Sequence, residues 1–152
     1  MSLSRWLIAT AGLALVVGAM AWLTKMGAII ATDGRVTHTG AAGSSFTIGL
    51  GLLSVGAAGL GLRLSMSVDL LVLRVILTVG FTFVFVLSFF VFSAIGYVIV
   101  AGARVVVGDT LPRYMLGEAG ILISAVVWMV IGAVLLFGSV RKPRNAASSR
   151  VV

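Results

Sequence analysis

The fold is decided by residues 70–103, which read LLVLRVILTVGFTFVFVLSFFVFSAIGYVIVAGA and contain a single charged side chain, Arg74. A helix crosses the hydrocarbon core of a bilayer with about 20 predominantly apolar residues. Three further stretches, residues 6–31, 41–62 and 119–140, are also apolar and long enough to do so. Because only short, charged connections separate the four stretches, the sequence predicts a multi-pass membrane protein.

Composition supports helices rather than strands. Of the 152 residues, 61% are hydrophobic and only 10% are charged, whereas a soluble domain is about one quarter charged. A transmembrane barrel would show alternating segments of about 10 residues, but these stretches are longer and apolar on all sides. We therefore predict an all-α fold, an antiparallel four-helix transmembrane bundle. Residues 1–144 form a single domain, and residues 145–152 form a flexible basic tail.

The charge distribution predicts the orientation of the chain. The formal net charge is +7, and the basic residues lie at the ends of the apolar stretches and in the tail, which favours lipid headgroups over nucleic acid as their partners. Cytoplasmic segments of membrane proteins are enriched in Lys and Arg. With both termini inside, that side holds Arg5, Arg63, Arg74, Arg141, Lys142, Arg144 and Arg150, and the outer side holds Lys25, Arg35, Arg104 and Arg113.

We therefore expect both termini to be cytoplasmic. The strongest anchor on that side is formed by Arg141, Lys142 and Arg144, directly after the fourth stretch.

Three tryptophans suggest how the spans sit in the bilayer. Trp6 and Trp22 are spaced to lie near the two interfaces, where indole rings concentrate. Lys25 follows Trp22 by about one turn and is expected to extend to water. Trp128 falls in the middle of its span. Because its indole N–H needs a partner there, we expect Trp128 to face protein rather than lipid.

The second span carries a stripe of small residues that we call the α-seam. Its members repeat every three or four positions and are Gly40, Ser44, Thr47, Gly51, Ser54, Ala58 and Gly61. Small residues let two helix backbones approach closely in lipid. The favoured interpretation is that the second span is the inner helix of the bundle. The alternative is that the α-seam contacts another subunit.

The third span contains a phenylalanine cluster. Phe81, Phe85, Phe89 and Phe92 share one helical face, while Phe83 and Phe90 point elsewhere. The favoured role of the shared face is core packing. The alternative is a site for a lipid, a quinone or a pigment.

The connections offer few chemical groups. His38 is the only histidine, and without a second metal-ligating residue nearby it is best interpreted as a polar loop residue rather than a ligand or proton carrier. Arg104, Asp109, Arg113 and Glu118 are expected to form a surface ion network in the third connection.

Catalysis and coupled transport usually require ionisable side chains inside the membrane, and the middles of the four spans contain none. The sequence has no cysteine, and no nucleophile–base pair, metal cluster or nucleotide motif is present. We therefore expect a protein that is not an enzyme and that binds no cofactor or metal.

Functions that depend on packing remain. The favoured one is a structural or accessory subunit of a larger membrane assembly. The alternatives are a homo-oligomeric channel or pore and, third, a quinone- or lipid-binding subunit of a redox complex. The expected partners are membrane lipids and other membrane subunits or further copies of the chain, not nucleic acid.

Overall fold

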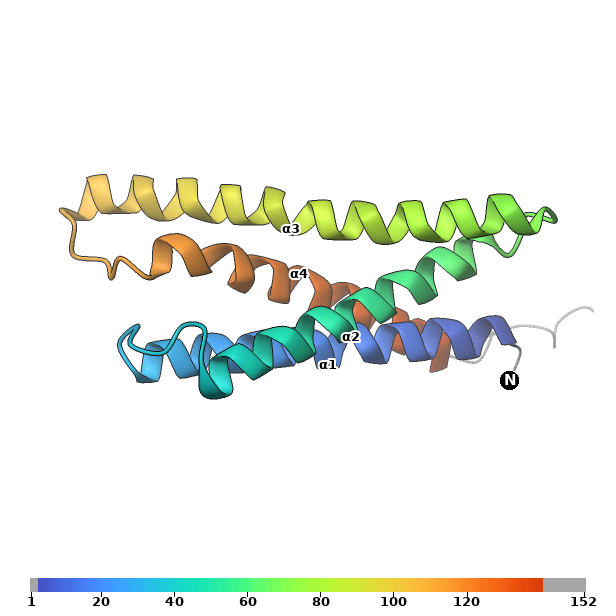
Figure 1. Ribbon diagram of the computed structural model, residues 1–152, viewed down its shortest axis with the longest axis horizontal. Coiled ribbons are helices and arrows are strands. Elements are labelled where there is room, and N and C mark those ends of the chain that lie inside the picture. Colours follow the sequence, from blue (N-terminus) through green and yellow to red (C-terminus); the bar gives the residue numbers. More distant parts are fainter. Residues whose placement is uncertain (1–2, 141–152) are drawn as a thin grey trace, which may run out of the picture.

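The computed structural model describes residues 3–140 (Figure 1). Its helices are α1 (Leu3–Ala31), α2 (Gly40–Ser65), α3 (Leu71–Val107) and α4 (Met115–Val140). All four are long and apolar enough to cross a membrane, which confirms the predicted all-helical fold of a multi-pass membrane protein. The helices extend a few residues beyond the predicted spans. The basic anchor Arg141, Lys142 and Arg144, like the predicted tail, lies outside the described residues.

Successive helices run in opposite directions (Figure 1). The α1–α2 and α3–α4 connections lie together at one end of the bundle, here called the loop end. The start of α1, the α2–α3 turn and the end of α4 lie at the other, here called the terminal end. α1 and α3 each pack against both α2 and α4, which cross between them.

The helices meet at pairs of glycines. Between α1 and α4, a Cβ atom added to Gly12 would lie 2.9 Å from the Gly132 carbonyl oxygen, and one added to Gly132 would lie 2.8 Å from that of Gly12. Between α1 and α2, a Cβ on Gly18 would lie 3.0 Å from the Gly49 carbonyl oxygen. Real Cβ atoms do not approach so closely, so these crossings require glycine on both helices.

The two contacts of α3 follow the same rule. A Cβ on Gly96 would lie 2.7 Å from the backbone nitrogen of Gly120 on α4. On α2, a Cβ on Gly61 would lie 3.2 Å from the backbone of Thr78. Each of the four main helix contacts therefore contains at least one glycine at which an added Cβ atom would press on the partner helix.

The most buried helix is α1, which differs from the predicted interior position of the second span. Its buried face repeats every three or four residues and includes Ala11, Leu15, Gly18, Trp22, Lys25 and Ile29. By contrast, α3 is largely exposed. It has 37 residues and is about 55 Å long, against about 30 Å of hydrocarbon, so it must tilt or protrude.

Left-handed residues end two of the helices. Asp33 and Gly34 follow α1 with φ of 50° and 75°, and the Gly34 N–H donates to the Ile29 carbonyl at 2.9 Å, as in a Schellman motif. Gly108, with φ of 79°, ends α3 similarly. The Tyr114 ring lies directly against Gly34, leaving no room for a Cβ there, so the two connections at the loop end contact each other.

The glycine contacts predict that replacement by alanine has a large effect on stability at Gly49 and a small effect at Gly51. A Cβ on Gly49 would overlap the buried Trp22 ring, whereas Gly51 has nothing within 4 Å. Gly49→Ala should lower the free energy of unfolding by about 1–3 kcal/mol through overpacking. Gly51→Ala should change it by less than about 1 kcal/mol. Unfolding by denaturing detergent measures both, and equal losses would contradict the assigned α1–α2 contact.

Candidate functional site

A buried ion pair lies inside the bundle near the loop end. The Lys25 Nζ atom is 3.0 Å from Oε2 of Glu118, and the two side chains are only 2% and 8% exposed. Lys25 comes from the buried face of α1, and Glu118 from the first turn of α4. The amino-terminal end of a helix dipole favours a carboxylate in that position. The pair therefore joins α1 to α4 where both helices are shielded from water.

Aromatic rings surround the ammonium group. The Phe46 ring of α2 lies with its centroid 4.7 Å from Lys25 Nζ, a cation–π distance. Trp22 stacks on Phe46 at 5.7 Å with ring planes 9° apart, and its Nε1 donates a hydrogen bond to the Phe46 carbonyl oxygen at 3.1 Å. Phe89 of α3 completes the group, 5.3 Å from the Trp22 ring. All four helices thus contribute to one buried site, which we call the Lys25 site.

The expectation that Lys25 extends to water is wrong. Trp22 is fully buried and Lys25 nearly so, because both belong to the inward face of α1. One signal in the sequence was available: Gly18, Trp22 and Lys25 repeat at the spacing that keeps residues on one helical face. Trp6, by contrast, is 57% exposed.

The expected ion network of the third connection is not formed as predicted. Arg104 pairs with Asp109 across the end of α3, but Glu118 turns inward to Lys25. Arg113 is exposed. Burying Lys25 and Glu118 costs desolvation free energy, and each buried charge is tolerated only while its partner is present.

The phenylalanine cluster packs into the bundle. Phe85 is buried with its ring 4.6 Å from that of Trp128, edge to face, so Trp128 faces protein. Phe89 contacts the rings of the Lys25 site, and Phe81 packs against the same core. Phe92 is half-buried.

The remaining two rings of α3 point outward. Phe83 and Phe90 are 67% and 63% exposed, on the opposite side of the helix from Phe85. The inward rings of Phe85 and Phe89 contact Trp128 and Trp22 respectively, so this part of the cluster packs as core.

The α-seam divides into two parts. Gly40, Ser44, Thr47 and Gly51 are exposed, Ser54 and Ala58 are half-buried, and Gly61 is buried against α3. The part of α2 that faces α1 is instead the neighbouring face, which includes Ala42, Gly49, Leu53 and Gly56. Within residues 3–140, the loop-end half of the α-seam is therefore exposed rather than packed.

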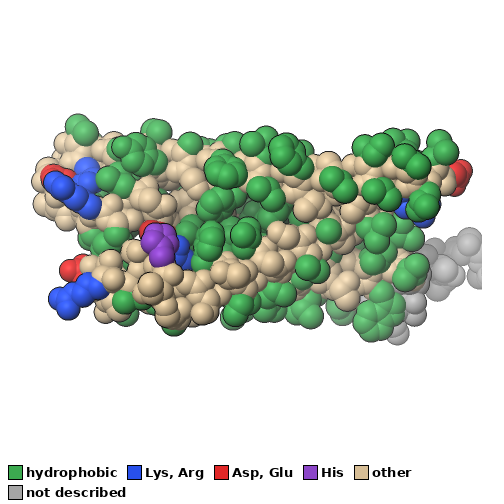
Figure 2. All heavy atoms as spheres, in the orientation of Figure 1, with side chains coloured by type: hydrophobic (Ala, Val, Ile, Leu, Met, Phe, Trp, Pro, Cys, Tyr) green, Lys and Arg blue, Asp and Glu red, His purple; other side chains and the backbone are tan. Residues whose placement is uncertain are grey.

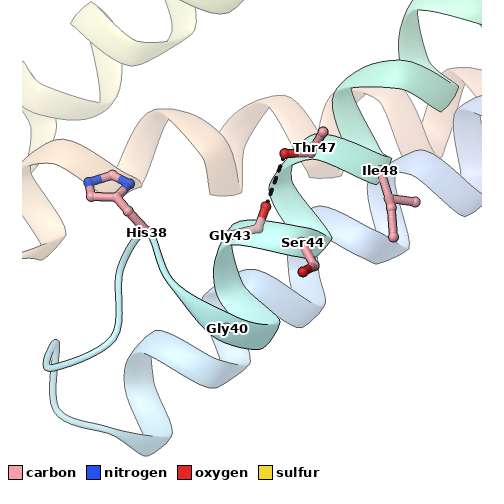
Figure 3. Close-up of a pocket in the computed structure, with 6 residues that line it drawn as sticks. All are labelled: His38, Gly40, Gly43, Ser44, Thr47 and Ile48. Atoms are coloured by element: carbon pink, nitrogen blue, oxygen red, sulfur yellow. Dashed lines mark hydrogen bonds between the residues drawn. The ribbon is translucent and has the colours of Figure 1, made fainter.

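His38 lies beside this exposed half (Figure 3). It borders an open hollow of about 570 Å³ lined also by Gly43, Ser44 and Thr47. Its imidazole points away from Ser44, and the Thr47 hydroxyl donates to the Gly43 carbonyl oxygen at 3.2 Å. Within residues 3–140, no three His, Asp or Glu side chains gather as a metal site would require.

The chemistry of the Lys25 site is electrostatic and structural. Its polar groups are an ammonium, a carboxylate and an indole N–H, and each has its partner within the bundle. The arrangement can hold α1, α2 and α4 in one register.

Comparison with known proteins does not assign a family. No protein-family model matches the sequence, and no curated protein or solved structure gives a significant match.

Removing one charge of the pair should destabilise the bundle more than removing both. Glu118→Gln leaves the Lys25 ammonium buried without a counter-charge and should cost about 3–5 kcal/mol. The double variant Lys25→Met/Glu118→Leu should recover most of that loss, because it leaves no buried charge. Arg104→Gln, at the more exposed ion pair, should cost less than about 1 kcal/mol.

Unfolding in detergent measures all three variants. Additive effects of Lys25→Met and Glu118→Leu would show that the two side chains do not interact.

Proposed function

We propose that the chain is a non-catalytic accessory component of a larger membrane assembly and binds a partner helix through the exposed half of the α-seam. The observation that carries this proposal is the open surface of α2 at Gly51, where an added Cβ atom would have no neighbour within 4 Å. Ser44 and Thr47, on the same stripe, are also exposed. Side chains this small leave a groove along the helix that a second helix backbone can enter.

The use of glycine elsewhere in the bundle supports this proposal. Gly12, Gly18, Gly96 and their partners lie at crossings where any larger residue would clash. The same residue type in the same spacing is left open at Gly51. Lipid tails gain little from contact with such a surface, whereas a close helix contact accumulates dispersion energy.

The third helix offers further surface. Nearly all its large side chains outside the inward stripe are exposed, including Val72, Ile76, Phe83 and Val98. They suit either lipid or a neighbouring subunit, so α3 supports an assembly without indicating its composition.

The proposed orientation has both termini in the cytoplasm. Figure 2 shows that charged side chains gather towards the two ends of the bundle. Among residues 3–140, the terminal end carries three arginines, Arg5, Arg63 and Arg74, and one acidic residue, Asp69. The sequence adds the basic anchor directly after α4, and positive charge favours the cytoplasmic side.

A pore formed by several copies is the second proposal. It is favoured by the exposure of Ser44 and Thr47 on one face, where hydroxyl groups can line water. The Thr47 hydroxyl, however, already donates to its own helix, which is the arrangement that lets threonine face lipid or another helix without cost. This bond makes the partner-binding role the better supported one.

Substitution at Gly51 tests the proposal. Gly51→Leu should leave the chain folded but remove it from its assembly, because leucine fills the groove that the partner helix enters. Gly27→Leu is the matched control, since Gly27 is also exposed with nothing within 4 Å and lies on α1. The measurement is the mass and composition of the particle purified from native membrane in mild detergent.

The accessory role is supported if the wild-type particle contains other protein chains, and if these are missing from the Gly51→Leu preparation but present in Gly27→Leu. A particle made of this chain alone that conducts ions supports the pore instead. A monomer, or an unchanged particle in Gly51→Leu, would contradict both proposals.

A further inference from the structure

An apolar groove lies between three helices near the terminal end. Figure 1 shows α2 leaving α1 and approaching α3 in this direction, which opens a wedge between the helices. The groove has a volume of about 340 Å³, and its wall includes Leu7, Ala11, Ala58, Gly59, Leu62 and Thr78. Small residues at three of these positions keep the wedge open.

The wall of the groove presents little polarity. The Thr78 hydroxyl donates to the Arg74 carbonyl oxygen at 2.9 Å and lies 3.4 Å from the Ser65 hydroxyl, so its hydrogen-bonding capacity is used within the protein. A second apolar hollow of about 190 Å³ shares Leu62 and Thr78 with the groove and includes Arg74 in its wall. The apolar surface therefore continues to the aliphatic part of the Arg74 side chain.

Two arginines lie at this end of the bundle, Arg63 on α2 and Arg74 on α3, and within residues 3–140 neither forms an ion pair with a carboxylate. Arg63 follows Gly59 by one helical turn on the same face of α2, and its Nε is buried with no hydrogen-bond partner. Arg74 donates from Nε and Nη2 to the Val68 carbonyl oxygen at 3.3 and 2.7 Å. The carbonyl orients the group but leaves its positive charge uncompensated.

Within residues 3–140 the ion pairs are Lys25–Glu118 and Arg104–Asp109, so Asp69 forms an ion pair with neither Arg63 nor Arg74. Guanidinium groups bind phosphate oxygens through paired, charge-assisted hydrogen bonds. An apolar groove that leads to two such groups at a helix end matches a molecule with an acyl chain and an anionic headgroup.

We propose that this groove holds one acyl chain of an anionic phospholipid, whose phosphate is bound by Arg63 and Arg74. A free phosphate ion would use the arginines but not the groove, and a neutral lipid would use the groove but not the arginines. The site is separate from the α-seam surface at the loop end, so it does not depend on the proposed assembly.

The test is native mass spectrometry of the full chain in detergent with dioleoyl phosphatidylglycerol or dioleoyl phosphatidylcholine. The wild type should bind phosphatidylglycerol at least about tenfold more tightly, since one charge-assisted contact contributes about that factor. Arg63→Gln/Arg74→Gln should remove this preference. Arg35→Gln/Arg113→Gln, two exposed arginines at the loop end, should retain it.

The groove is tested separately from the charges. Ala58→Phe fills it and should weaken phosphatidylglycerol binding about tenfold with both arginines present. Val126→Phe, on the exposed face of α4, should have no effect. Excess inorganic phosphate should displace no more lipid than chloride at the same ionic strength.

Equal binding of both lipids by the wild type would overturn the proposal. So would unchanged binding in Ala58→Phe, equal losses in the two double arginine variants, or displacement by inorganic phosphate. Because Arg74 also holds the α2–α3 turn, thermal denaturation checks the fold of each variant. If Arg63→Gln/Arg74→Gln does not fold, Arg63→Gln and Ala58→Phe decide the outcome.

Discussion

The arrangement of the bundle depends on backbone contact at glycine pairs. In hydrocarbon, helices gain no hydrophobic free energy by meeting, so association rests on dispersion and interhelical hydrogen bonds. Gly12 with Gly132 and Gly18 with Gly49 bring α1 against two helices at once. The second contact places Gly49 directly beneath the Trp22 ring. Close approach at the crossings therefore determines which aromatic and charged side chains meet at the loop end.

The Lys25 site follows from that approach. Once α1 lies between α2 and α4, its inward face carries Trp22 and Lys25 to positions that water does not reach. The Trp22 indole donates a hydrogen bond to the Phe46 carbonyl oxygen. The Lys25 ammonium group pairs with Glu118 and lies over the Phe46 ring. An unpaired polar group there would cost several kcal/mol. The site therefore favours one register of the helices over alternatives that would separate these partners.

The surfaces that remain uncovered are the basis of both proposals made above. The exposed half of the α-seam presents small residues at the loop end, and α3 presents large apolar side chains along its length. At the terminal end, a groove leads to Arg63 and Arg74. These surfaces suit a helix, lipid tails and an anionic headgroup respectively. Together they are the basis of the proposal that the chain is held by its neighbours in the membrane.

The sequence by itself determined the four membrane-spanning helices, because long apolar stretches must pair their backbone groups internally in hydrocarbon. The alternation of phenylalanines along the third span also separated Phe85 from Phe83, since helical period alone sets their directions. Only the tertiary structure decided which small-residue face of α2 packs: Gly49 and Gly51 both lie on small stripes, and the choice depends on the shape of α1. The same holds for Lys25. Whether a lysine near a helix end extends to water or stays buried depends on a counter-charge, and Glu118 lies three helices further along the chain.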